Sequence, residues 1–133
     1  ALAQPERRVF ALEGDGSLLM QLGCLSTIAT LKPKNLSMIV MDNGIYQITG
    51  AQATPAAAAT DLIAVAIGCG LTNSTWAADE EDFDRLIDQS LTASEPMLIG
   101  VRIDDKPGTG ATRRDPVQIR ERFMLGVGVR EPM

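Results

Sequence analysis

Histidine is absent from the 133 residues of this sequence, and cysteine occurs only twice. Without histidine the chain has no imidazole base for a nucleophilic serine or cysteine, and no imidazole ligand for a transition metal. Cys24 and Cys69 both lie in apolar helical patterns. We therefore expect two reduced core thiols and a cytoplasmic location, rather than a disulfide framework or a catalytic cysteine.

Long apolar runs and an excess of positive charge are also lacking. No stretch is long enough to span a bilayer, and no signal-peptide pattern is present. The formal net charge of −5 argues against nucleic acid or an anionic membrane as a partner. With 45% hydrophobic residues, residues 1–133 are expected to form one domain with its own core.

The beginning of the chain is abrupt. Ala1–Ala3 has the composition of a last helical turn, and Pro5 would stop that helix because the residue before a proline is disfavoured in the α conformation. The sequence does not begin with methionine. We expect that the domain lacks its N-terminal part.

Two apolar runs, each followed by a polar turn with glycine, organise the first half of the chain. The run Val9–Leu12 leads to Gly14-Asp15-Gly16, and the run Met38–Met41 ends at Asp42-Asn43-Gly44. A helical pattern over Ser17–Leu31 joins them. A strand–helix–strand crossover is nearly always right-handed and makes its strands parallel, so both turns are expected at one edge of a sheet.

The residues of these turns suit a magnesium diphosphate. Asp15 offers a carboxylate oxygen, Asn43 an amide oxygen, and the backbone carbonyl of Ile45 can face the same point. Gly16 allows the backbone to approach a phosphate closely, and the helix that opens near Ser17 presents free N–H groups to an anion. Each turn alone is a common loop signal, whereas the pair at this spacing is specific.

The second half of the chain continues the alternation of helices and strands. The predicted elements are a helix over 61–68 capped by Thr60, a strand over 71–77, a helix after Asp79, a buried strand over 96–103, and a short helix over 117–124. Residues 44–60 and 104–116 are expected to form loops. The sequence therefore predicts an α/β fold, a doubly wound parallel sheet with helices on both faces.

The GDGS turn followed by DNG resembles the signature of thiamine diphosphate-dependent enzymes. By this resemblance Asp15, Asn43 and the carbonyl of Ile45 hold Mg²⁺ against the cofactor's diphosphate. The family usually has Asn-Asn at the second turn, so Asp42 is a departure from the pattern and a second candidate ligand. The cofactor-binding residues that the resemblance implies are Gly14, Asp15, Gly16, Ser17, Asn43, Ile45 and Tyr46.

Three further segments, TGAQATP, TDLIAVAIGCG and PVQIRERFM, are similar to the cofactor-binding half of sulfopyruvate and phosphonopyruvate decarboxylases. The resemblance implies decarboxylation of a 2-oxo acid, with the thiazolium ring taking up electrons as carbon dioxide leaves. It also implies an oligomer in which a pyrimidine-binding subunit or domain supplies the catalytic glutamate. Gln47, Thr49 and Gln52 are weaker candidates for substrate contacts.

Other functions remain open at this level. An acetolactate synthase-like carboligase would carry the same cofactor motif. A receiver domain shares the architecture, and MIVMDNG resembles its acceptor strand with Lys106 further on, but the acidic pair expected after the first strand is missing. A non-catalytic assembly subunit could retain the motif as a relic.

Overall fold

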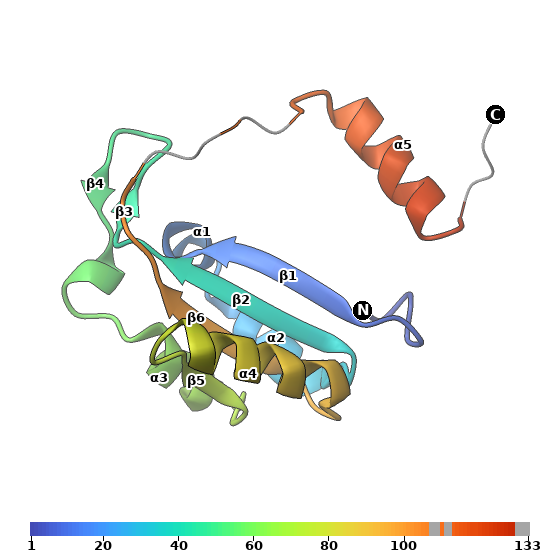
Figure 1. The fold of residues 1–133 in the computed structure, drawn as a ribbon, viewed down its shortest axis with the longest axis horizontal. Helices are drawn as coiled ribbons and strands as arrows, with labels where there is room; N and C mark the ends of the chain where they lie inside the picture. Colours follow the sequence, from blue (N-terminus) through green and yellow to red (C-terminus); the bar gives the residue numbers. More distant parts are fainter. Residues whose placement is uncertain (107–109, 111–112, 130–133) are drawn as a thin grey trace.

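The computed structural model describes residues 1–106, 110 and 113–129 (Figure 1). Helices and strands alternate along the chain, with a small hairpin inserted in the middle. In chain order the elements are β1 (Val9–Gly14), α1 (Asp15–Met20), α2 (Gly23–Leu31), β2 (Leu36–Asp42), β3 (Ile45–Tyr46), β4 (Gln52–Ala53), the 3-10 turn η1 (Pro55–Ala57), α3 (Leu62–Gly68), β5 (Ser74–Trp76), α4 (Glu80–Thr92), β6 (Met97–Arg102) and α5 (Pro116–Gly126).

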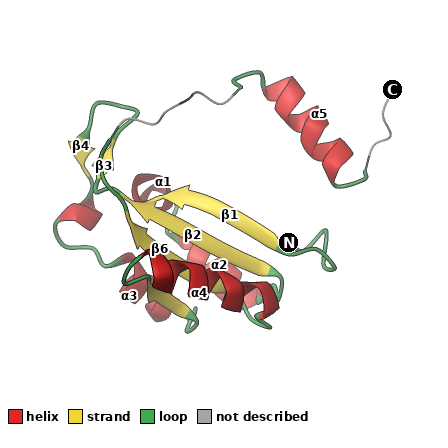
Figure 2. Ribbon diagram, viewed as in Figure 1, coloured by secondary structure: helices red, strands yellow, loops and turns green. Residues whose placement is uncertain are grey.

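Four of the strands form one parallel sheet in the order β1-β2-β6-β5. The two central strands, β2 and β6, are almost continuously apolar because both of their faces are covered. Gly14 pairs with Met41, and Asp42 pairs with Arg102, so the strands end together at one edge. Strands β3 and β4 form a separate antiparallel hairpin beside that edge (Figure 2).

Helices cover both faces of the sheet, as the sequence predicts. Helices α1, α2 and α3 bury Leu18, Leu25 and Leu62 in the larger core cluster. Helix α4 buries Leu86 in a smaller cluster that also contains Ile99 of β6. The chain passes from β2 to β5 and then returns to β6, so a right-handed crossover places α4 on the opposite face.

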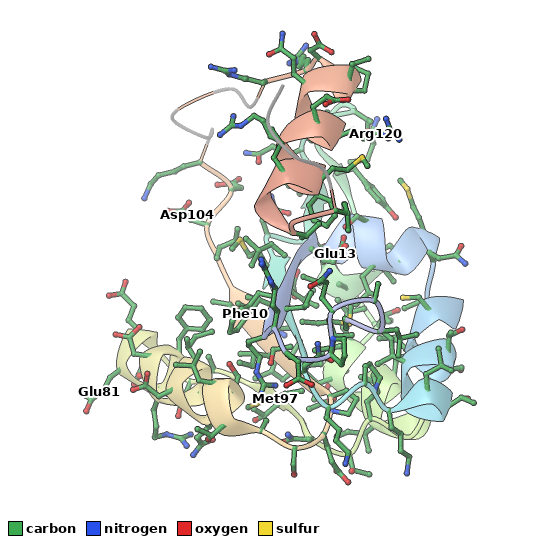
Figure 3. All side chains as sticks on the ribbon, turned by 90° about the vertical axis from the view of Figure 1, so that its right-hand side faces the viewer. Phe10, Glu13, Glu81, Met97, Asp104 and Arg120 are labelled. Carbon is green, nitrogen blue, oxygen red and sulfur yellow. The ribbon has the colours of Figure 1, made fainter. Side chains whose placement is uncertain are left out.

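Helix α5 lies apart from the sheet (Figures 1 and 3). It is predicted over 117–124 and runs from Pro116 to Gly126, with the Asp115 carboxylate accepting hydrogen bonds from the first turn. None of its residues is buried. Its last turn contacts the start of the chain, where Arg7 Nη1 donates to the carbonyl of Gly126 at 2.8 Å.

The single helix predicted over Ser17–Leu31 is wrong, because the structure contains two helices there. Helix α1 ends at Met20 and α2 begins at Gly23. At Gln21 the backbone leaves the helical region, with φ −142° and ψ 48°, and its N–H bonds to the carbonyl of Leu18. Glycine at position 23 weakens helix propensity at this break, while the apolar spacing continues across it.

Three smaller predictions are also corrected. Ala1–Ala3 belongs to a turn in which the Gln4 N–H bonds to the carbonyl of Ala1, not to a helix. The strand predicted over 71–77 is limited to Ser74–Trp76. Helix α3 is capped by Asp61 and not by Thr60, since the Asp61 carboxylate accepts from two backbone N–H groups of the first turn. None of the described helices is both long enough and apolar enough to cross a membrane.

Candidate functional site

Two acidic side chains meet where β1 and β2 end. Asp15 directly follows Gly14, the last residue of β1, and Gly14 pairs with Met41, so Asp15 comes beside Asp42. Both carboxyl groups are buried, with Asp15 2% exposed and Asp42 4% exposed. Buried carboxylates are unusual unless they have partners that compensate for lost hydration. The turn that contains Asp15 and the turn that contains Asn43 therefore lie at the same edge of the sheet, as the sequence predicts.

Thr54 is the partner of Asp15. Its Oγ1 donates to Asp15 Oδ2 at 2.6 Å, and the threonine itself is 2% exposed. The backbone places it there because the Thr54 N–H bonds to the carbonyl of Gly44 at 2.8 Å, which closes the β3–β4 hairpin over the site. Sequence reasoning missed this residue, since its partner lies 39 positions away.

Asp42 has two partners of different kinds. Its Oδ1 accepts the N–H of Gly44 at 3.0 Å, and its Oδ2 pairs with Arg102 Nη1 at 3.2 Å. Burial raises the pKa of Asp42, and the neighbouring Asp15 carboxyl raises it further, whereas the Gly44 hydrogen bond and Arg102 lower it. Arg102 was also missed from the sequence, because it comes from a strand that returns beside β2 after 60 residues.

Asn43 and Ile45 form a tight turn immediately after Asp42. Asn43 Oδ1 accepts the N–H of Ile45 at 3.1 Å, and both residues are half-buried. Gly44 between them has φ +68°, a conformation that glycine adopts without strain, as the sequence predicts. An amide oxygen has two lone pairs, so Asn43 Oδ1 can bind a cation while it accepts the hydrogen bond from Ile45.

The predicted diphosphate-binding residues gather around the first turn of α1. The Gly14 N–H donates to Ser17 Oγ at 3.1 Å, and the Ser17 hydroxyl donates to Glu13 Oε2 at 2.6 Å. A Cβ at Gly16 would lie 2.6 Å from the Tyr46 ring, so glycine is required for that ring to lie against α1. The structure thus brings Gly16 and Tyr46 together, although they are 30 positions apart.

The three candidate substrate residues lie on the β3–β4 hairpin, outside the buried acidic pair. All three, Gln47, Thr49 and Gln52, are exposed. Gln47 Nε2 donates to the backbone carbonyls of Asp105 and Lys106 at 2.9 and 3.1 Å, which ties the hairpin to the segment after β6. Lys106 pairs through its side chain with Asp104, whereas the cation beside Asp42 is Arg102.

The donor set of this edge suits a hard cation. Among the described residues no group of three or more acidic, cysteine or histidine side chains could hold a metal ion. A metal at this edge would therefore have at most two carboxylate ligands from these residues, Asp15 and Asp42, and would take further ligands from amide and carbonyl oxygens, a set of hard oxygens that suits Mg²⁺. Two buried carboxyl groups side by side repel each other, and a divalent cation would relieve that repulsion.

The two cysteines lie away from this chemistry. Cys24 and Cys69 are free thiols that pack, partly buried, against the larger core cluster. Burial, followed by the charge of Glu13, raises the pKa of the Cys24 thiol. A raised pKa keeps the thiol protonated and unreactive at neutral pH, in keeping with a role in the core.

A doubly wound parallel sheet with an acidic, amide-lined carboxyl edge is the architecture of a cofactor-binding α/β domain. The chain belongs to the thiamine pyrophosphate enzymes, because the model of their C-terminal TPP-binding domain matches residues 1–101.

Decarboxylases are prominent among the relatives. The chain is 41% identical over 130 residues to the sulfopyruvate decarboxylase subunit beta of Methanothermobacter thermautotrophicus, covering 96% of this chain and 65% of that subunit. It is 34% identical over 119 residues to the phosphonopyruvate decarboxylase of Streptomyces viridochromogenes, covering 88% of this chain and 30% of that enzyme. The chain thus spans less than two thirds of either relative.

A solved structure shares the fold. The thiamine diphosphate-dependent 4-hydroxybenzoylformate decarboxylase of Rhodococcus jostii RHA1 superimposes with a TM-score of 0.67 at 29% identity. The match covers 77% of this chain and 21% of that chain. The predicted family and fold class are therefore confirmed.

Proposed function

We propose that this chain is the thiamine diphosphate- and Mg²⁺-binding half of a 2-oxo acid decarboxylase of the sulfopyruvate or phosphonopyruvate type. The observation that carries the proposal is the buried Asp15 carboxylate, set beside Asp42 and Asn43 at the ends of adjacent parallel strands. Similarity to decarboxylases of these two kinds over most of the chain supports the choice of reaction.

The metal ligands in this proposal are Asp15, Asn43 and the backbone carbonyl of Ile45. Asp15 is suited to the role because Thr54 holds one carboxylate oxygen and leaves lone pairs of the carboxylate available. The turn at Gly44, with its positive φ, brings Ile45 back toward Asn43, whose Oδ1 accepts the N–H of Ile45. All three donors are hard oxygens, as Mg²⁺ requires.

The diphosphate would be held by the turn from Gly14 to Ser17. The first backbone N–H groups of a helix have no partner within the helix. At Gly14 the nearest atoms to a Cβ would be 4.0 Å away, which leaves room for a phosphate beside the strand end, whereas the space over Gly16 is filled by Tyr46. Tyr46 packs on Gly16 and would shield this turn from water. Such shielding strengthens the attraction between the metal and the phosphate oxygens, because it lowers the local dielectric constant.

When bound, thiamine diphosphate supplies a site that accepts the electron pair left by the departing carboxylate. The residues of this chain would position that cofactor and exclude water, and the resemblance assigns the catalytic glutamate to a pyrimidine-binding domain. We therefore propose that a pyrimidine-binding partner subunit or domain completes the active site. The pairing agrees with relatives that are themselves beta subunits.

Calorimetry and an activity assay test this function. We expect the chain to bind thiamine diphosphate in the presence of Mg²⁺ and to bind it at least tenfold more weakly with EDTA, since the metal neutralises both the phosphates and Asp15. We also expect decarboxylation of sulfopyruvate or phosphonopyruvate only after the pyrimidine-binding half is added. Cofactor binding that is indifferent to the metal would indicate a relic site, and decarboxylation by the chain alone would refute the need for a partner.

A further inference from the structure

Arg102 is the one described residue that places a positive charge directly on the buried acidic pair. It is the last residue of β6 and lies opposite Asp42 in the parallel register. Its Nη1 is 3.2 Å from Asp42 Oδ2, while its side chain remains 69% exposed. The guanidinium thus contacts the buried carboxylate of Asp42 and is also exposed to solvent.

The position of Arg102 is fixed from the other side by Trp76. The guanidinium carbon lies 4.5 Å from the centroid of the indole ring, a cation–π distance. The ring occupies the space above Gly100, where a Cβ would be 2.5 Å from the indole, and its Nε1 donates to Asp61 Oδ1 at 3.1 Å. Because Gly100 and Arg102 are two residues apart, they face the same side of β6. Stacking on Trp76 restricts the guanidinium, so Arg102 loses less side-chain entropy when it also pairs with Asp42.

The charge on Arg102 matters because the site must accept a cation and an anion together. Asp15 and Asp42 without a counter-ion would form a doubly negative pocket, which attracts a bare divalent cation and repels a diphosphate. With Arg102 on Asp42, a single uncompensated carboxylate remains, and the pocket is less repulsive to phosphate oxygens.

We propose that Arg102 sets the charge of this site, so that it takes a divalent metal together with a diphosphate and disfavours the metal alone. The inference rests on the proposed function. Asp42, which is bonded to Arg102 and to the Gly44 N–H, supports the turn, and Asn43, which directly follows β2, is left as the ligand. The departure from the Asn-Asn pattern is thereby compensated within this chain, by an arginine on a neighbouring strand.

The test measures two affinities that a charge effect moves in opposite directions. Mn²⁺ alone is titrated by electron paramagnetic resonance, and thiamine diphosphate is titrated by calorimetry at saturating Mg²⁺. In Arg102→Met we expect Mn²⁺ to bind about tenfold more tightly and thiamine diphosphate about tenfold more weakly, the size of a one-charge change beside an ionisable group. Arg102→Lys keeps the charge but loses the planar stack on Trp76, so both affinities should shift in the same directions by less than in Arg102→Met.

Matched variants separate charge from structure. Arg85→Met removes an exposed arginine whose partner is Asp82 on α4, so both affinities should stay unchanged. Asp42→Asn in the Arg102→Met background should return Mn²⁺ affinity to the original value, because the second carboxylate is gone. If Arg102→Met does not fold, Asp42→Asn alone tests the same idea, with Mn²⁺ expected to bind more weakly and the cofactor more tightly.

Two results would overturn the inference in distinguishable ways. A parallel loss of both affinities in Arg102→Met, with Arg102→Lys equally impaired, would make Arg102 a packing residue while leaving the proposed function intact. Failure of the unaltered chain to bind thiamine diphosphate with Mg²⁺ would remove the proposed function itself, and this inference with it.

Discussion

The two ends of the parallel sheet use polar side chains in opposite ways. At the amino end, the side chains of Arg8 and Asn35 donate hydrogen bonds to backbone carbonyls. At the carboxyl end, Asp15 and Asp42 place two buried carboxyl groups side by side. The acceptors at the amino end are the carbonyl oxygens of Ala1, Gln4, Arg7, Lys34, Leu91 and Ala93.

The difference separates stability from binding. Hydrogen bonds from a side chain to carbonyls that would otherwise lack donors stabilise the folded chain, and Arg8 links the start of β1 to the end of α4 in this way. Buried like charges destabilise it unless a ligand of opposite charge arrives. The amino end therefore holds the fold together, and the carboxyl end fits the cation site that we propose. Substitutions at the two ends should have separable effects.

The largest effect is expected from Asp15→Asn at the carboxyl end. Loss of the carboxylate should weaken metal-dependent binding of thiamine diphosphate by about a hundredfold, because Asp15 is the charged ligand in the proposed site. The free energy of unfolding should stay the same or rise by about 1 kcal/mol, since repulsion with Asp42 is relieved. Calorimetry and urea unfolding measure the two quantities. A large fall in the free energy of unfolding with unchanged cofactor affinity would contradict this comparison, because Asp15 would then stabilise the fold and not bind the metal.

At the amino end, Arg8→Met should show the complementary behaviour. The variant keeps the apolar stem but loses donors to three carbonyls, so we expect the free energy of unfolding to fall by about 2 kcal/mol. Cofactor affinity of the folded variant should not change. Arg85→Met is the control, because an exposed ion pair within one helix adds little to stability. Equal effects of the two variants would contradict the comparison.

The smallest effect is expected at the cap of α3, which lies between the sheet edge and Trp76. Asp61→Ala removes the acceptor of two backbone N–H groups and should cost about 1 kcal/mol, while Asp61→Asn retains capping and should cost less. Hydrogen bonds to the carboxylate, that from Ala64 first, lower the pKa of Asp61 in the folded chain.

The pH dependence of that effect has a defined sign. A carboxyl group with a lowered folded-state pKa stabilises the fold above its unfolded pKa, and this contribution is lost as the pH falls through the folded value. The stability difference between the original chain and Asp61→Ala should therefore be constant at neutral pH and narrow below about pH 4, near the ordinary aspartate pKa. Thermal unfolding across this range measures it. A difference that persists at pH 2 would mean that the cap does not act through its charge.

Much of this arrangement could be predicted from local sequence. The apolar runs before Gly14 and Asp42 identified β1 and β2, and the crossover rule placed their turns at one edge, as the register now confirms. The short turn at Gly44 was equally readable, because DNG requires a residue that adopts positive φ easily. These features depend on neighbours within a few residues.

The remaining parts depend on contacts that local sequence does not encode. Thr54 reaches Asp15 only because the β3–β4 hairpin folds back over the strand ends. Arg102 reaches Asp42 only because β6 returns between β2 and β5. The break near Gln21 was hidden because apolar spacing continued through it. The features that the sequence did not predict are contacts between residues far apart in the chain, or a break in a helix that apolar periodicity does not detect.

The stacking of Trp76 under Arg102 has a practical consequence. Trp76 is the single tryptophan of the sequence, so the intrinsic fluorescence of the protein at long excitation wavelengths comes from one indole. That indole touches the guanidinium whose other end rests on Asp42. The emission of the unlabelled protein is therefore an optical signal from beside the strand ends.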